Sequence, residues 1–482
     1  MSSQRITHDI RPLSDDPPDD VLFSSDKGVR IIELNRPAKL NSLNASMIRK
    51  IIPRMREWEQ SQLAHAIVIR STSPKAFCAG GDVASIARSI LDQTEKPSTE
   101  TEKASSASIG GTYFALEYQL DHLIATYRQP YIAFMDGITM GGGMGLACHA
   151  PFRIATEKTV LAMPETTIGF FPDVGTTFFL PRLDNNIGKY LATTSDRLNG
   201  IDALFAGVAT HYMHSSSLPD LTTRIGELDF SDATPYAQRL LIIAETLQEF
   251  TNALPYDVPP TLVGSRLSVI NSCFAPTHPL GIISALEALA DDAAAEQAAW
   301  ARATLAGMRL RSPTSIAVAC RQLQLGKKWS LAQAFEREHA LARHLCAYPD
   351  FVAGVKARLL DKPPTQPEWT PGTLEEVQDG DVEKLFMVGD DGPRMRVLEG
   401  REGLDYAEYP WDQDEELRRA GGCGLPRERD VQRVFEEIGG DKEECIRRIV
   451  GTWPGKDAVE VKVRDVLARR TKKDEEGQMQ WV

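Results

Sequence analysis

Two acidic residues, Glu165 and Asp173, lie in the apolar segment MPETTIGFFPDVG, residues 163–175. A buried carboxylate is costly, because an apolar environment disfavours its charged form and raises its pKa. Such a shift brings a carboxyl group into the range in which it exchanges protons during catalysis, and a second acid nearby enlarges the effect. The segment is therefore a candidate for proton-transfer chemistry, and the alternative is that its acids cap or flank the turns made by Pro164 and Pro172.

Two glycine-rich stretches have the composition of an anion-stabilising site. KAFCAGGDV (75–83) and GITMGGGMGLACHA (137–150) each follow a strand-like run, and the second leads into an apolar helix. Glycine lets the backbone approach a ligand closely, and a helix start presents unpaired N–H groups and the positive end of the helix dipole. Two such donors would form an oxyanion hole for acyl chemistry. Taken singly, each stretch is equally well explained by a tight turn or by close helix packing.

Four short apolar runs predict the strands that position these residues. They are GVRIIELNRP (28–37), HAIVIRS (65–71), QPYIAFMDG (129–137) and FRIATEKTVLAMPE (152–165). An amphipathic helix, which Pro53 should shorten or kink, separates the first two runs. Strands that alternate with helices predict a layered α/β domain.

The remaining sequence divides by composition. Residues 89–112 are rich in Ser, Thr and Glu, which indicates a mobile surface excursion between strands. We expect an N-terminal extension over 1–21, a core over 22–234, a helical C-terminal region over 235–390 and a charged C-terminal extension over 391–482.

Composition excludes several classes of function. A net charge of -13 argues against a general nucleic-acid or anionic-membrane binder, and no apolar stretch is long enough to span a bilayer. The seven cysteines show neither a CxxC motif nor a Cys/His cluster of zinc spacing, so we expect no metal site. No clear transit peptide is visible at the N-terminus, and self-association into a homo-oligomer stays open.

Taken in order, the motifs form a recognisable set. NRPAKLNSL, AFCAGGD, DGITMGGGMGLA and FRIATEKTVLAMPETTIGFFPDVG resemble the crotonase (enoyl-CoA hydratase/isomerase) superfamily, and within it the 3-hydroxyisobutyryl-CoA hydrolases of valine breakdown. The resemblance extends from about 22 to 390. It implies a crotonase-like ββα spiral core with a helical C-terminal region.

The resemblance also implies roles for individual residues. The oxyanion donors of the family fall on the backbone N–H groups of Gly81 and Gly142, and the acids of the hydrolases fall on Glu165 and Asp173. Glu117, in FALEYQL, matches a further acid that contacts the substrate.

One further assignment concerns coenzyme A itself. NRPAKLNSL matches the segment that lies along coenzyme A in relatives, which places Lys39 at a phosphate. The acyl-CoA ester is the implied substrate, and neither a metal nor another cofactor is expected.

One position at which this chain departs from the hydratases of the family distinguishes hydrolysis from hydration. Hydratases carry a glutamate in GGGCE after the helix start, and this chain has Gly145 there. Addition of water to a double bond lacks its second acid, whereas thioester hydrolysis needs an oxyanion hole, a base or nucleophile, and water. The sequence therefore favours hydrolysis, and it leaves open whether Glu165 activates water or attacks the thioester.

Two alternatives remain at this point. One is another acyl-CoA reaction on the same fold, such as hydration or isomerisation. The other is a structural role, because some relatives are subunits of the mitochondrial ribosome. The family resemblance favours a mitochondrial location, and a cytoplasmic one is the alternative.

Overall fold

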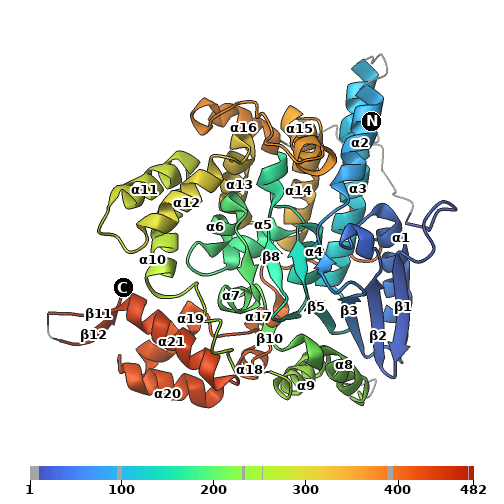
Figure 1. Cartoon of the computed structure of the whole chain (residues 1–482). Helices are drawn as coiled ribbons and strands as arrows, with labels where there is room; N and C mark the ends of the chain where they lie inside the picture. Colours follow the sequence, from blue (N-terminus) through green and yellow to red (C-terminus); the bar gives the residue numbers. More distant parts are fainter. Residues whose placement is uncertain (1–9, 95–99, 231–233, 252, 388–394, 476) are drawn as a thin grey trace.

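Two β-sheets carry the residues of interest in the computed structural model, which describes residues 10–94, 100–230, 234–251, 253–387, 395–475 and 477–482. The larger sheet has the order β1-β2-β3-β5-β7-β10, in which only β1 is antiparallel to its neighbour (Figure 1). Its strands are β1 (Val21–Asp26), β2 (Val29–Leu34), β3 (Ala66–Ser71), β5 (Tyr131–Met135), β7 (Phe152–Ala155) and β10 (His211–Tyr212). The first three predicted strand runs form β2, β3 and β5, while the fourth run, 152–165, is divided between β7 in this sheet and β8 in the smaller sheet.

Strands of the smaller sheet alternate with strands of the larger sheet along the chain. Its order is β4-β6-β8-β9, with β4 (Ala76–Cys78), β6 (Ile138–Met140), β8 (Val160–Ala162) and β9 (Leu198–Asn199). The pairs β3/β4, β5/β6 and β7/β8 each place one strand in each sheet before the chain enters helical structure. The predicted ββα spiral is confirmed.

The ends of β4 and β6 therefore lie side by side, because these two strands pair in parallel. Gly81 follows β4, and Gly142 follows β6 at the start of α4 (Gly142–Cys148). This pairing brings the two glycine-rich stretches of the sequence together.

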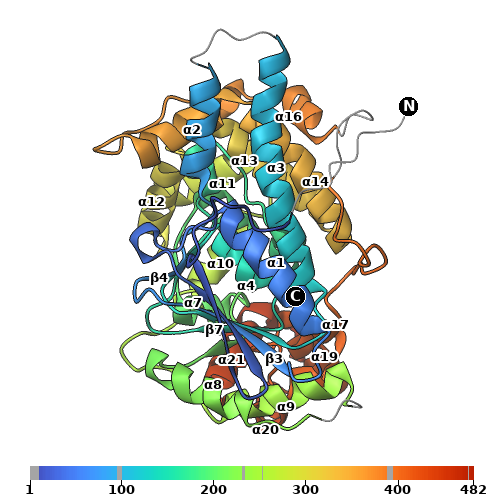
Figure 2. The same cartoon turned by 90° about the vertical axis from the view of Figure 1, so that its right-hand side faces the viewer.

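The helices near the N-terminus differ from expectation in two places. Helix α1 (Ala45–Glu59) continues past Pro53, whose side chain faces solvent. The predicted excursion over 89–112 is helical in its described residues, because α2 (Val83–Thr94) and α3 (Glu100–Ala125) extend into it and project from the molecule (Figure 2). Gly110 and Gly111 do not break α3; a Cβ on either would lie within 2.8 Å of Cys346 or Arg343, so they allow close packing of α14 (Leu331–Cys346).

A helical region follows the sheets, as predicted. Its helices lie beside the smaller sheet, and their apolar residues join the main hydrophobic core (Figure 1). The predicted helical region over 235–390 contains α9 (Tyr236–Gln248), α10 (Gly264–Cys273), α11 (Pro279–Asp291), α12 (Ala298–Met308), α13 (Pro313–Gly326), α14, α15 (Pro349–Val355) and α16 (Asp379–Phe386). The earlier helices α5 (Thr176–Phe179), α6 (Ile187–Thr194), α7 (Gly200–Phe205) and α8 (Leu218–Gly226) lie within the predicted core, among and after its last strands.

The chain after residue 395 is mostly helical and has two parts. Met395, Leu398, Tyr409, Trp411 and Leu417 join the main hydrophobic core, so apolar contacts cross the predicted boundary at residue 391. A second, small core forms among later helices. The elements are α17 (Pro410–Gln413), α18 (Glu415–Arg419), α19 (Glu428–Glu437), α20 (Lys442–Thr452), α21 (Lys456–Arg470) and the hairpin β11 (Thr471–Lys473) and β12 (Met479–Trp481).

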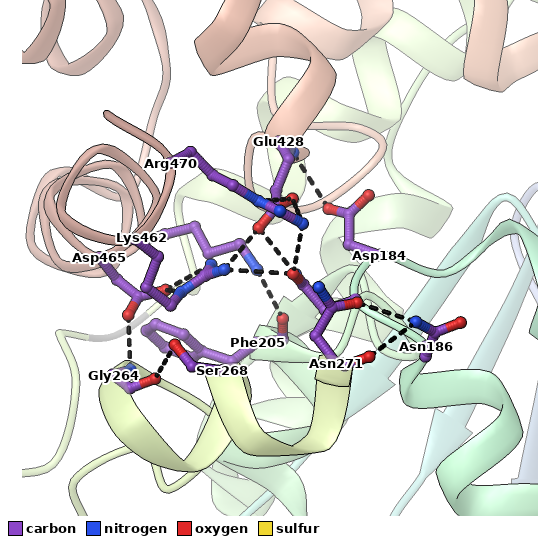
Figure 3. A network of polar contacts seen from close by, with 12 residues as sticks. Asp184, Asn186, Phe205, Gly264, Ser268, Asn271, Glu428, Lys462, Asp465 and Arg470 are labelled. Carbon is purple, nitrogen blue, oxygen red and sulfur yellow. Dashed lines mark hydrogen bonds and ion pairs between the residues drawn. The ribbon is translucent and has the colours of Figure 1, made fainter. Parts of the chain in front are cut away.

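Polar contacts fasten this second part to the core (Figure 3). Glu428 pairs with Arg469 and Arg470, and its backbone N–H donates to Asp184. The buried ammonium group of Lys462 donates to the Phe205 carbonyl at 3.0 Å. In the described part of the chain, no helix has the length and apolar content needed to cross a membrane.

Candidate active site

A cavity of about 460 Å³ lies at the glycine turns that follow β4 and β6, two neighbouring strands of the smaller sheet. Gly81, Glu117, Gly142, Glu165 and Asp173 all line it. They come from four separate stretches of sequence: the turn after β4, helix α3, the start of α4, and the segment after β8. The structure thus brings five of the six predicted site residues together.

Lys39 is the residue that does not join them. It ends the 3-10 turn Pro37–Lys39, is exposed, and is not among the residues that line the cavity. Its predicted contact with a coenzyme A phosphate stays a prediction.

The amides of Gly81 and Gly142 are available to a ligand. Neither nitrogen donates a hydrogen bond within the described chain. A Cβ built on Gly142 would lie 3.0 Å from the Gly81 nitrogen and 2.3 Å from Oε1 of Glu117. The two amides and the Glu117 carboxyl therefore converge, and a side chain at position 142 would fill the point where they meet. Two convergent N–H donors can stabilise negative charge on a carbonyl oxygen.

Glu165 approaches the same point from the end of β8, which pairs in parallel with β6. It begins the 3-10 helix Glu165–Ile168 after β8 and is 5% exposed. A Cβ on Gly141, whose φ is +48°, would lie 2.8 Å from Oε1 of Glu165, while Oε2 has no hydrogen-bond partner in the described chain. One carboxyl oxygen thus lies beside the oxyanion turn and the other is free to contact substrate or water.

The three acids are held in an environment that disfavours charge. Burial, and secondarily the charge of Asp173, raise the pKa values of Glu165 and Glu117 well above their usual range. Burial also raises the pKa of Asp173, to about 7, although the Tyr118 hydroxyl donates to Oδ2 at 2.7 Å and lowers it. The set therefore holds protons at neutral pH and can give one up near pH 7, which suits acid–base chemistry.

The turn that carries Asp173 is fixed by a residue that the sequence analysis missed. Glu338 of α14 accepts hydrogen bonds from the backbone N–H groups of Gly175 at 2.6 Å and Thr177 at 2.9 Å. Burial raises the pKa of Glu338 to about 8. Its position was visible in the sequence, because Glu338 lies on the apolar face of α14, seven residues after Leu331 and three after Phe335.

The space beside Gly145 is already filled. A Cβ there would lie 2.7 Å from Oδ1 of Asp121 and 2.8 Å from Cβ of Val174. Asp121 is fully buried, and neither of its carboxyl oxygens has a hydrogen-bond partner in the described chain. No side chain fits at position 145 without a shift of its surroundings.

Three arginines at the cavity were also missed. Arg197, Arg311 and Arg358 line it and come from the loop before β9, the loop between α12 and α13, and the π-helix Lys356–Leu360 after α15. Arg311 donates to the Thr194 carbonyl, and the charge of Arg358 contributes to lowering its pKa after burial. They give the cavity a cationic side suited to phosphate. No motif in the sequence marks them.

Comparison with known proteins decides the family. The profile of the enoyl-CoA hydratase/isomerase family matches residues 29–386. The chain belongs to this family. A solved carnitinyl-CoA dehydratase from Mycobacterium thermoresistibile is 31% identical, covers 79% of this chain and 99% of its own, and superposes with a TM-score of 0.65.

Two relatives of this family member carry different names. The small ribosomal subunit protein mS47 of Neurospora crassa is 45% identical over 97% of this chain and 89% of its own length. The mitochondrial 3-hydroxyisobutyryl-CoA hydrolase of Gallus gallus is 41% identical over 76% of this chain and 88% of its own. The crotonase assignment is thus secure, while the two names point to different roles.

Proposed function

We propose that this crotonase hydrolyses 3-hydroxyisobutyryl-CoA to 3-hydroxyisobutyrate and coenzyme A. The observation that carries the proposal is the convergence of Glu165 and Glu117 on the two unpaired amides of Gly81 and Gly142. The 41% identity to a hydrolase of this name supports the substrate. Hydration is disfavoured, because Asp121 and Val174 occupy the space beside Gly145 that a second glutamate would need.

In thioester cleavage, the amides stabilise charge and the acids transfer protons or attack the substrate. The carbonyl oxygen accepts hydrogen bonds from the Gly81 and Gly142 N–H groups, which stabilise the negative charge that develops there. Once the acid set has lost a proton, ionised Glu165 either takes a proton from an attacking water or attacks the carbonyl carbon itself. The C–S bond then breaks, and the coenzyme A thiolate takes up a proton. In the second route, water hydrolyses the mixed anhydride on Glu165.

The neighbouring side chains position the rest of the substrate. Asp173 holds the attacking water or the substrate's hydroxyl, and Glu117 lines the acyl part of the cavity. Arg197, Arg311 and Arg358 bind the phosphates of coenzyme A by charge-assisted hydrogen bonds. The proposed reaction needs no metal or redox cofactor.

Release of free thiol from a panel of acyl-CoA esters tests the proposal. We expect 3-hydroxyisobutyryl-CoA to be cleaved, and Glu165→Gln to lower kcat by about 10²- to 10⁴-fold with little change in melting temperature. Crotonyl-CoA, a substrate for hydration, is the comparison ester. Equal thiol release by wild type and Glu165→Gln, or hydration of crotonyl-CoA in place of cleavage, contradicts the proposal.

A specific observation favours a second function, association with a ribosome. The relative named as a small ribosomal subunit protein matches 97% of this chain, which includes the C-terminal extension, whereas the Gallus gallus hydrolase matches 76%. We infer that the extension contributes to such an association and that the protein acts in mitochondria, the location in the name of the hydrolase. Co-sedimentation of the tagged full-length protein with mitochondrial ribosomal subunits tests both inferences, with Glu165→Gln as a catalytically impaired control.

A further inference from the structure

The segment that begins the C-terminal extension, residues 395–411, packs against α3 and against Thr126, the residue that follows this helix. It forms hydrogen bonds with one face of α3, the helix that carries Glu117. The side chains of α3 contact backbone carbonyls of the segment, and one arginine of the segment contacts α3 in return. These contacts are Gln119 to Arg396 at 2.8 Å, His122 to Leu404 at 3.0 Å and Arg401 to Thr126 at 2.7 Å.

Tyr409 is the residue of this segment that reaches furthest into the core. It is 3% exposed, and its hydroxyl lies 2.6 Å from Nδ1 of His149. Its ring stacks on Trp411 and meets Phe178 edge to face. His149 ends α4, the helix whose first residue is the oxyanion glycine Gly142.

The second ring nitrogen of His149, Nε2, contacts the turn that carries Asp173. Nε2 lies 2.7 Å from the Val174 carbonyl, which can only accept a hydrogen bond, so Nε2 carries the proton. Burial lowers the pKa of His149 to about 4, so the ring is neutral and Nδ1 is an acceptor. The Tyr409 hydroxyl therefore donates to Nδ1, and Nε2–H donates to Val174. Two hydrogen bonds connect the extension to the residue next to Asp173.

The turn needs such support because its backbone is strained. Val174 has φ +55°, a left-handed conformation that is unfavourable for a β-branched residue and costs about 1–3 kcal/mol. Gly175 follows with φ +77°, and a Cβ there would lie 2.4 Å from the His149 ring. Glu338 holds the amides of this turn from the other side. The turn is thus held between α14 and the His149 ring.

We propose that Tyr409 is a positioning residue that holds the Asp173 carboxyl in place through His149 and the Val174 carbonyl. The start of the C-terminal extension is then part of the acyl-CoA site, although it lies outside the match to the family profile, which ends at residue 386. The kinetic test of this inference rests on the proposed thioester hydrolysis. The spectroscopic test depends only on the geometry and does not require that activity.

The kinetic test uses Tyr409→Phe, His149→Gln and the double variant in the full-length chain. Tyr409→Phe keeps the ring packing and removes only the hydroxyl. We expect a fall in kcat of about 10- to 100-fold with KM within about twofold of wild type, since small displacements of a catalytic group are costly. The double variant should be no worse than the more impaired single variant, because both act through one chain of contacts. Tyr406→Phe is the matched control, since the Tyr406 hydroxyl has no hydrogen-bond partner in the described chain.

A spectroscopic readout keeps the inference separate from the proposed activity. The ¹³C resonance of the Asp173 carboxyl, assigned by its loss in Asp173→Asn, should shift and titrate differently in Tyr409→Phe but not in Tyr406→Phe. An unchanged Asp173 resonance together with unchanged kcat overturns the inference. If wild type releases no thiol from any ester, the proposed function fails, while the Asp173 resonance still decides whether Tyr409 positions this carboxyl.

Discussion

The carboxyl group of Asp121 occupies the space beside Gly145 into which any larger residue would project. The contact would be 2.7 Å from a Cβ to Oδ1 of Asp121, with Val174 at 2.8 Å on the other side. We predict that Gly145→Ala lowers the free energy of unfolding by about 1–3 kcal/mol, the usual cost of overpacking, and reduces thioester cleavage by displacing Val174. Thermal or urea unfolding and thiol release measure the two effects.

Gly307→Ala is the matched control for this prediction. Gly307 lies inside α12, and a Cβ there would meet nothing within 4 Å. This substitution should stabilise by about 0.5–1 kcal/mol, because alanine is the better helix former. Equal effects of the two substitutions would show that position 145 has room for a side chain.

Removal of the Tyr118 hydroxyl should move the pH dependence of the reaction. This hydroxyl donates to Asp173 and lowers its pKa, so Tyr118→Phe raises that pKa above about 7. Because the acid set must lose a proton before reaction, the rising limb of kcat/KM moves to higher pH. A hydrogen bond to a charged group contributes about 1.5–3 kcal/mol, so the rate below pH 7 should fall at least about tenfold. Tyr131→Phe, which removes a buried hydroxyl without a partner, should leave the profile unchanged.

The same raised pKa has an effect on stability. Asp173 has a folded-state pKa of about 7 against an ordinary value of 3.8, so folding favours its protonated form. The stabilisation is present below about pH 4 and is lost as the pH rises through 7. Asp173→Asn removes this dependence, and its melting temperature should exceed that of wild type by more at pH 8 than at pH 5. A constant difference across this range would show that Asp173 is not buried as a protonated acid.

The arginines of the cavity should act on the nucleotide end of the substrate. We predict that Arg358→Ala raises KM for the coenzyme A ester by about tenfold or more, the loss expected for a charge-assisted hydrogen bond, with kcat little changed. The pantetheine ester of the same acid, which lacks the nucleotide phosphates, should not distinguish variant from wild type. Arg309→Ala is the control, because Arg309 pairs with Glu287 on the surface. An equal loss with both esters would assign Arg358 to the acyl end.

Glu428 should hold the small second core against the rest of the protein (Figure 3). It is mostly buried between Arg469 and Arg470, so Glu428→Ala leaves Arg470 without a carboxylate partner and leaves Arg469 with Asp465 alone. Breaking a buried ion pair in this way costs about 3–5 kcal/mol. We expect faster hydrogen exchange and proteolysis in α19 to α21, with the catalytic core unaffected. Glu443→Ala removes the exposed pair with Arg464 and should cost less than about 1 kcal/mol; equal protection in both variants contradicts the prediction.

Local sequence predicted the parts of the fold whose signals are local. The runs VRIIEL and YIAFM are almost continuously apolar because parallel strands are buried on both faces, and they form β2 and β5. The glycine turns and the acids at 165 and 173 were found because chemistry restricts those residue types within short motifs. The polar composition of 89–112 was misleading, because Gly110 and Gly111 serve contact with α14, more than 200 residues later.

The residues that were missed depend on distant partners. Glu338 accepts hydrogen bonds from the backbone amides at 175 and 177, and the Tyr409 hydroxyl contacts His149. Asp121 occupies space that is open only because position 145 is a glycine. None of these relations has a fixed spacing along the chain, so a single sequence holds no pattern for them. Only Glu338 left a trace, as an acid on the apolar face of a helix.

Labelling with ¹⁸O-water tests whether Glu165 acts as a nucleophile or as a general base. Its Oε2 is unpaired in the described chain, and Oε1 lies beside the oxyanion turn, a position from which the carboxylate can attack the carbonyl carbon directly. If it does, and if H₂¹⁸O then opens the mixed anhydride at the Glu165 carboxyl carbon, the acyl group leaves with an oxygen of Glu165 and label stays in Glu165. Mass spectrometry of the peptide that contains Glu165, after repeated turnover in H₂¹⁸O, should then show a mass increase that Glu117 does not share. The free acid alone gains label in a single turnover if Glu165 acts only as a base, and absence of label from Glu165 after many turnovers would exclude an anhydride that water opens at the Glu165 carboxyl carbon.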